Sequence, residues 1–150
     1  MRRQDRQISE EEAVAILASG EYGVLSTVAP NGAPYGLPLN YCLLEHKIYF
    51  HVALVGKKLE HIAADPRVSF CVVGKTQIQP EKFSTRYKSC IVEGVTAEVF
   101  GEEKLAALIA LVAKYSPDFT AEGAAYIDKA AAKTRVFAIT VTAITGKARR

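Results

Sequence analysis

The chain lacks the features that mark membrane, secreted and disulfide-stapled proteins. Its longest apolar runs are too short to cross a bilayer, and no apolar stretch follows the arginines of the opening MRRQDRQ. We therefore expect no secretory signal and a cytoplasmic location. The three cysteines are odd in number and widely spaced in apolar runs, which predicts reduced core cysteines rather than a disulfide framework or a zinc site.

Signatures of nucleophilic, metal-dependent and nucleic-acid chemistry are also missing. There is no GxSxG motif, and no histidine signature accompanies the cysteines. His46, His51 and His61 do not have the spacing of metal ligands, so we expect no metal. The net charge is only +3, and the basic residues concentrate at the two tails without a zinc-finger or RNA-binding pattern, so we expect no nucleic-acid partner.

The composition that remains is that of an ordinary globular protein. Hydrophobic residues make up 49% of the 150 residues and charged residues 23%. A chain of this length buries about two-thirds of its unfolded surface, enough for one core without disulfides. No repeat or linker interrupts it, so we expect one domain over residues 1–150.

Helical patterns occur at both ends and in one central segment. Ser9 and Glu12 form a capping box ahead of an apolar stripe that ends at Gly20. Another pattern ends where Asp65-Pro66 disfavours further helix. We expect helices over residues 9–19, 57–64, 102–114 and 121–133.

Alternating apolar and polar residues predict six strands, over residues 22–28, 33–44, 48–52, 68–73, 86–100 and 135–144. Pro30-Asn31-Gly32 is a hairpin turn, and Gly94 inside a long strand indicates a bulge or a close backbone approach. The polar segment 74–85 is expected to be a loop that serves as a lid, an interface arm or a disordered stretch. Short connections, with the helices grouped at the ends, favour a mainly β, α+β fold: a six-stranded antiparallel barrel flanked by helices.

The most informative stretch is KIYFHVALVGKKLEHIAADPRVSF, residues 47–70. Gly56 allows a tight turn, and Lys57 and Lys58 follow in the first turn of a helix. Free N–H groups and the positive end of the helix dipole favour a phosphate there, and each lysine adds a cation. The alternative is a pair of solvated surface lysines.

In order, spacing and content, these segments resemble the FMN-binding split-barrel superfamily of pyridoxamine 5'-phosphate oxidase, and in particular its short nitroimidazole-reductase-type branch. The resemblance covers nearly the whole chain. It rests on MRRQDRQIS, APYGLPLNY, the central block of residues 47–70, SCIVEGVTAEVF and AITGKA.

The resemblance implies an FMN-dependent homodimer in which both subunits complete each flavin site. Lys57 and Lys58 match the basic pair that holds the FMN phosphate, and Ser89 matches a polar contact from the other subunit. The remaining positions match contacts to the ribityl chain and the isoalloxazine ring. They are Phe50 and His51 on one strand, and Leu37, Pro38, Leu39 and Asn40 on another.

The chain departs from the oxidase pattern at several positions. The oxidase carries an arginine and histidine motif for the substrate phosphate near its end, whereas FAITVTAITGKARR has no histidine. Oxidation of the vitamin is therefore not expected. Asn40 stands in place of a lysine and Tyr35 in place of an arginine. Lys57 stands where the oxidase often has arginine, which keeps the charge but loses the bidentate fork.

The leading functional hypothesis is an FMN-dependent oxidoreductase that reduces a small organic molecule, such as a nitroaromatic, with NADH or NADPH. His51 is the candidate catalytic residue because histidine titrates near neutrality, and the alternative is a strand histidine bonded for structure. Two other functions stay open. One is a non-catalytic flavin carrier or sensor, and the other is a split barrel that holds another anionic ligand, such as haem, with Lys57, Lys58 and His51.

Overall fold

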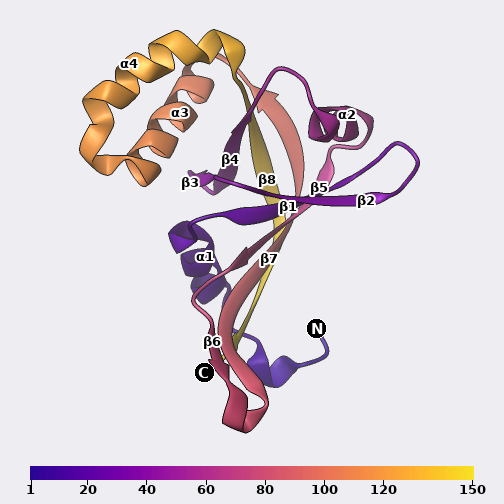
Figure 1. Cartoon of the computed structure of the whole chain (residues 1–150). Helices are drawn as coiled ribbons and strands as arrows, with labels where there is room; N and C mark the ends of the chain where they lie inside the picture. The colour runs from indigo at the N-terminus through magenta and orange to yellow at the C-terminus, as the bar shows by residue number, and fades with distance from the viewer.

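An eight-stranded antiparallel sheet organises the chain, and the computed structural model describes all of residues 1–150 (Figure 1). Neighbouring strands follow the order β2-β1-β5-β7-β8-β4-β3, and β6 pairs with β7 beside this path. The strands are β1 (Gly23–Val28), β2 (Pro34–Leu39), β3 (Cys42–Leu44), β4 (Lys47–Val52), β5 (Arg67–Val73), β6 (Gln77–Gln79), β7 (Ser84–Val99) and β8 (Arg135–Arg149).

Four α-helices surround the sheet: α1 (Glu10–Ser19), α2 (Lys57–Ala64), α3 (Gly101–Tyr115) and α4 (Thr120–Ala130). Short 3₁₀ turns occupy η1 (Gln4–Arg6), η2 (Pro80–Lys82), η3 (Pro117–Phe119) and η4 (Ala131–Lys133). The expected capping box is present, since the Glu12 N–H donates to Ser9 Oγ at 3.1 Å. No α-helix combines the length and the hydropathy that a bilayer crossing requires.

The expected count of six strands is wrong. The strand expected over 33–44 divides at Asn40 and Tyr41 into β2 and β3, and the segment expected to be a loop over 74–85 contains β6. These two changes account for the eight strands. The last strand also continues to Arg149, beyond the expected end at residue 144. Pairing with β7 along its whole length gives those polar residues backbone partners that a sequence pattern does not reveal.

The break between β2 and β3 closes the sheet into a split barrel. Only two residues separate these strands, yet they stand at opposite ends of the hydrogen-bonded order. The sheet must therefore curl until its two ends approach each other, leaving a seam between them. Tyr41 makes this turn while fully buried: its N–H donates to Tyr115 Oη at 3.1 Å, and its carbonyl accepts from Lys114 Nζ at 2.9 Å.

Two apolar cores lie on opposite faces of the curled sheet. The larger one fills the barrel and includes Leu17 of α1, Phe50, Phe70 and Tyr41, all fully buried. The smaller one lies outside the barrel, where Leu108 and Leu111 of α3, with residues of α4, cover β3, β4 and β8. Strand β4 is therefore covered on both faces, which explains why it is apolar along most of its length.

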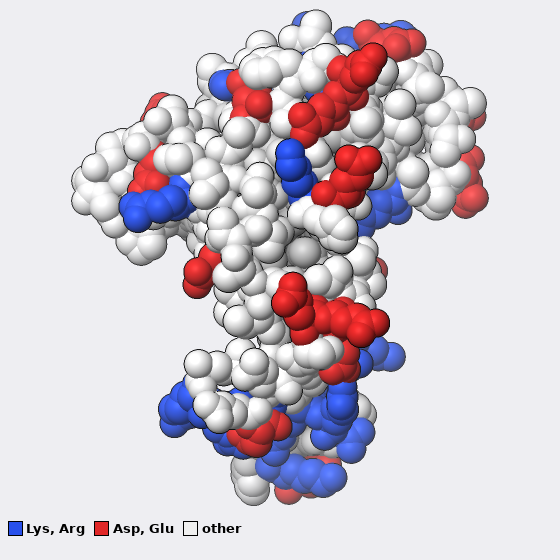
Figure 2. All heavy atoms as spheres, turned by 180° about the vertical axis from the view of Figure 1, so that it is seen from behind, with Lys and Arg blue, Asp and Glu red and all other residues white.

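An arm formed by β6 and the far ends of β7 and β8 extends away from the barrel, and both chain termini lie along it (Figure 1). Basic side chains gather at this end of the molecule (Figure 2). Five of them line a shallow groove of about 740 Å³: Lys75, Arg86, Lys88, Arg149 and Arg150. The segment expected to be a loop therefore becomes part of an ordered arm.

Gly94 lies at the predicted bulge and at the predicted close approach. Glu93 pairs with Ala143 and Gly94 with Val141, so Thr142 is the extra residue in β8. A Cβ added at Gly94 would lie 2.6 Å from the Thr140 carbonyl oxygen and 2.6 Å from Ile139 Cγ2. The backbones approach too closely there for a side chain.

We predict that Gly94→Ala lowers the free energy of unfolding by about 1–3 kcal/mol, the usual cost of forcing extra volume into a packed site. Urea denaturation of the variant beside the unmodified chain measures this difference. Gly74→Ala is the matched control, because its added Cβ would lie 3.5 Å from the nearest atom, an ordinary contact. Equal stability of the two variants would show that β8 yields at the bulge.

Candidate functional site

The N-terminus of α2 presents an uncapped helix end beside two lysines. Gly56 precedes it with φ 155° and ψ 160°, a backbone conformation that glycine alone adopts readily, and no side chain caps the helix. The Leu59 and Glu60 N–H groups donate to the Gly56 carbonyl at 3.0 and 3.3 Å. The N–H groups of Lys57 and Lys58 come before this first turn and are free to meet an anion.

His61 anchors α2 to the barrel. Its side chain is only 5% exposed, and its Nδ1 lies 2.9 Å from Thr27 Oγ1 on β1. The Tyr35 ring of β2 meets the imidazole edge-on at 5.2 Å between centroids, and Lys57 Nζ lies 5.7 Å from the same ring. Tyr35, which stands in place of the oxidase's arginine, thus contacts both His61 and Lys57.

His51 lies on β4, close to the start of α2. The residue is exposed to solvent, and the protein around it partly desolvates its ring. This partial desolvation, together with the positive charge of Lys58, lowers the pKa of His51 from its usual 6.5. The imidazole is therefore neutral at pH 7 and offers one donor and one acceptor nitrogen.

A cavity of about 480 Å³ lies next to His51 on the side away from α2, between the barrel and the hairpin formed by α3 and α4 (Figure 1). Asn40, at the seam after β2, and His51 lie on the barrel side of this cavity. Its remaining lining is mainly apolar: Leu108, Leu111, Val112, Tyr115, Ser116, Phe119, Glu122, Gly123, Tyr126, Ile127, Ala130, Ala131 and Thr134.

The structure brings His51 near Lys58 at the start of α2, where Lys57 also lies, and it places Asn40 and His51 in the wall of one cavity. The other residues predicted to contact the flavin do not join this group. Phe50 is fully buried and its ring stacks on that of Phe137 at 5.8 Å between centroids, so it exposes no surface to a ligand in this chain. Pro38 is exposed at the edge strand β2, whereas the side chains of Leu37 and Leu39 pack against the barrel core. These four assignments stay predictions about backbone and surface contacts.

Ser89 lies far from the rest of the predicted site within one chain. His51 pairs with Val136, which pairs with Val99 of β7, and Ser89 comes ten residues before Val99 on the same strand. At roughly 3.3 Å per residue, this corresponds to about 33 Å. A single ligand therefore cannot contact Ser89 and His51 of the same chain.

Two contributors to the site are not evident from the sequence. His61 gave no signal beyond an apolar helix face, because its partner Thr27 is 34 residues away in sequence. The cavity was missed because α3 and α4 each look like ordinary amphipathic helices. A usable signal was present in the aromatic residues Phe119 and Tyr126, which remain 61% and 70% exposed on the hairpin.

We predict that NMR titration of the histidine side chains gives His51 a pKa below 6.5, and that Lys58→Ala raises it by removing the neighbouring charge. Because the unfolded chain binds this proton more readily, His51 costs stability as the pH falls through about 6.5 and costs none at higher pH. Lys57→Ala is the control, since desolvation is the larger cause of the lowered pKa and the charge that adds to it is that of Lys58. A pKa of His51 unchanged by Lys58→Ala would contradict this assignment.

Three solved structures at high structural similarity share this architecture. A protein of Mycobacterium tuberculosis described only as conserved and hypothetical aligns at TM-score 0.84 and 22% identity over 99% of this chain and 89% of that one. A FAD and heme binding protein from Mycobacterium smegmatis aligns at TM-score 0.84 and 20% identity over 97% and 74% of the two chains. A provisionally assigned 5-nitroimidazole antibiotic resistance protein from Bacteroides thetaiotaomicron aligns at TM-score 0.80 and 23% identity over 94% and 85%.

At these identities the three structures establish the fold and leave the activity open. No curated protein matches the chain. The family model of pyridoxamine 5'-phosphate oxidase, however, matches residues 9–148, which is nearly the whole sequence and includes the lysine pair, His51 and the seam. The chain therefore belongs to the pyridoxamine 5'-phosphate oxidase family.

Proposed function

We propose that this chain binds a flavin at the N-terminus of α2 and acts as an oxidoreductase that reduces a small organic molecule with NADH or NADPH. The observation that carries the proposal is the uncapped helix end with Lys57 and Lys58 beside His51. A design for stability alone would place acids in that first turn, since cations there oppose the helix dipole. A bound phosphate turns this unfavourable arrangement into a favourable one.

The surrounding residues fit the rest of a flavin. Strand β2 is an edge strand, so one side of its backbone over Leu37 to Leu39 is free to bond the polar edge of a flat ring. Lys57 Nζ lies 5.7 Å from the ring centroid of Tyr35 on the same strand. The Mycobacterium smegmatis relative is a FAD and heme binding protein, which supports a flavin on this fold.

We favour FMN over FAD, because the site has one helix N-terminus and one lysine pair, which suit a single terminal phosphate. Haem is the second candidate ligand, supported by the same relative and by the solvent exposure of His51. Absorption spectra separate the two, since a flavin and a haem absorb at different wavelengths.

A bound flavin would supply hydride or electron transfer, and the protein would supply position and electrostatics. Lys57 and Lys58 hold the phosphate. The imidazole of His51, with its lowered pKa, would offer one donor and one acceptor nitrogen for hydrogen bonds beside the ring, and it would act as a proton donor only through its protonated form. The end of β8 lies on the arm, paired with Tyr87, and lacks the oxidase's histidine, so vitamin oxidation is not part of this proposal.

A second copy of the chain completes the site in this proposal. The outward face of β1, β5 and β7 exposes the apolar side chains of Val24, Val73, Ile91 and Val95, and a sheet face of this kind usually meets a partner. Ser89 pairs with Val73 on the same strands. A partner packed on this face would bring its own Ser89 to the flavin that the first chain holds.

We predict that the purified protein has a flavin absorption spectrum, and that Lys57→Ala combined with Lys58→Ala weakens flavin binding at least tenfold. The loss of even one charge-assisted hydrogen bond to the phosphate costs about 1.5–3 kcal/mol. Titration of flavin fluorescence measures the dissociation constant. Lys129→Ala on α4 is the control and should bind flavin normally.

Unchanged flavin affinity in the double lysine variant would refute the phosphate assignment. Anaerobic addition of NADH or NADPH then separates two functions that share this site. Bleaching of the flavin spectrum supports an oxidoreductase, whereas a spectrum that stays oxidised supports a flavin carrier or sensor. A haem spectrum would support the second candidate ligand instead.

We predict that light scattering gives a mass twice the 16.3 kDa of one chain, and that Ile91→Glu shifts it toward one chain by placing a charge on the apolar sheet face. Ile109→Glu is the matched control, because Ile109 is similarly exposed on α3, away from that face. A monomeric unmodified protein would contradict the shared site.

A further inference from the structure

We propose that the cavity under the α3–α4 hairpin is the substrate site, and that it selects flat aromatic molecules that carry no negative charge. This inference rests on the proposed function, because it places the electron acceptor beside the proposed flavin. Thirteen of the residues that line the cavity belong to the helical hairpin and its connections, and none of these thirteen was predicted to contact the cofactor.

The cavity shares two residues with the cofactor site. Asn40 and His51 both line it, and both were predicted to contact the flavin. The hairpin and α2 lie on opposite sides of β4 (Figure 1), so the cavity and the lysine pair approach His51 from different directions. A molecule in the cavity would therefore lie next to a ring held over β2 and β4, without competing for the phosphate position.

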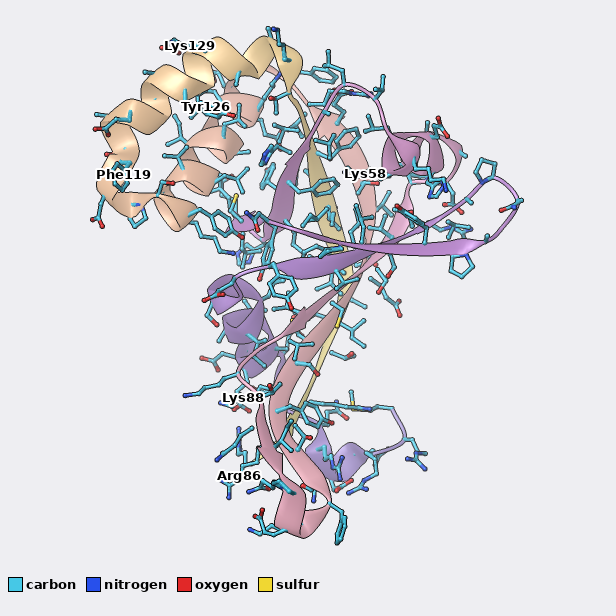
Figure 3. The ribbon with its side chains drawn as sticks, in the orientation of Figure 1. Lys58, Arg86, Lys88, Phe119, Tyr126 and Lys129 are labelled. Carbon is cyan, nitrogen blue, oxygen red and sulfur yellow. The ribbon has the colours of Figure 1, made fainter.

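Its shape and lining suit an aromatic ligand. The volume of about 480 Å³ is in the range of small-molecule sites, and most of the lining is apolar. Phe119 and Tyr126 project from the hairpin on the side of the molecule away from Lys58 (Figure 3), although such large rings are normally buried. Rings kept at the edge of a cavity offer stacking surfaces to a flat molecule.

The walls are held in place without a ligand. Gly123 of α4 lies so close to α3 that an added Cβ would come within 2.4 Å of Val112 Cγ1. Tyr115 is fixed at the seam, where its hydroxyl donates to the Glu21 carbonyl at 2.5 Å and accepts from the Tyr41 N–H. A cavity between such fixed elements loses little entropy when it binds a rigid ring.

The charges around the cavity give it a selectivity opposite to that of the cofactor site. None of its fifteen lining residues is lysine or arginine, and Glu122 is its one carboxylate. The nearest seam cation, Lys114, is already bonded to the Tyr41 carbonyl and lies 3.7 Å from the Tyr41 ring centroid. An anionic ligand would face Glu122 with no lysine or arginine in the lining to compensate, whereas a neutral or cationic ligand would not be repelled.

Three ligands with one ring skeleton test this selectivity: 4-nitrobenzylammonium, 4-nitrobenzyl alcohol and 4-nitrobenzoate. Isothermal titration calorimetry on the full chain as purified, and again after saturation with FMN, measures their dissociation constants. We expect the anion to bind at least about fivefold more weakly than the alcohol. Glu122→Gln should remove most of this difference, and equal binding of all three ligands to the unmodified chain would overturn the charge argument.

Two further variants locate the site. Phe119→Ala and Tyr126→Ala should each weaken binding of the alcohol by about tenfold, as expected for a lost aromatic contact, and leave FMN affinity unchanged. Phe83→Ala is the matched control, since Phe83 is 98% exposed at the tip of the arm. Aromatic binding that survives both variants would overturn the assignment of the cavity.

The outcomes also separate this inference from the proposed function. FMN affinity that falls in parallel in the Phe119 and Tyr126 variants would mean that the cavity holds the cofactor, which overturns the inference and leaves flavin binding intact. A chain that binds no flavin, yet binds the alcohol in a manner sensitive to Phe119→Ala and Tyr126→Ala, would refute the proposed function and retain the aromatic site.

Discussion

The turn at Tyr41 is the constraint on which the barrel, the helical hairpin and the cavity depend. Two residues carry the chain between strands at opposite ends of the sheet, so the sheet curls. A buried backbone turned out of the ladder needs other partners, and Lys114 and Tyr115 provide them. These two residues end α3, so the bonds that satisfy the seam also fix the helix that bounds the cavity.

This arrangement places two chemically different surfaces on either side of His51. Toward α2, the backbone N–H groups and two lysines favour an anion. Toward the hairpin, the lining is apolar and its one charged carboxylate disfavours an anion. In these proposals the cofactor phosphate and the substrate are sorted by charge, and the imidazole of His51 lies between their two sites. Asn40, which lies at the seam, lines the same cavity as His51, so the proposed site of reaction adjoins the turn at Tyr41.

The local parts of the fold were predictable because their causes are local. The capping box at Ser9 and Glu12 places α1, and the Gly56-Lys57-Lys58 sequence places the start of α2, since each needs only neighbouring residues. Gly94 was recognisable because a glycine inside an alternating strand marks a bulge or a close backbone approach. The family model of pyridoxamine 5'-phosphate oxidase matches residues 9–148, a range that includes all of these segments.

Periodicity, caps and turns act over a few residues, so they suffice to predict the four helices, most of the strands and the lysine pair at a helix N-terminus. The break at Tyr41, the burial of Phe50, the His61–Thr27 anchor and the cavity of the hairpin follow only from contacts between distant parts of the chain. Each of these joins residues tens of positions apart, as when Tyr115 bonds Tyr41 across 74 residues. Periodicity records which face of an element is buried, but it does not record which distant element covers that face.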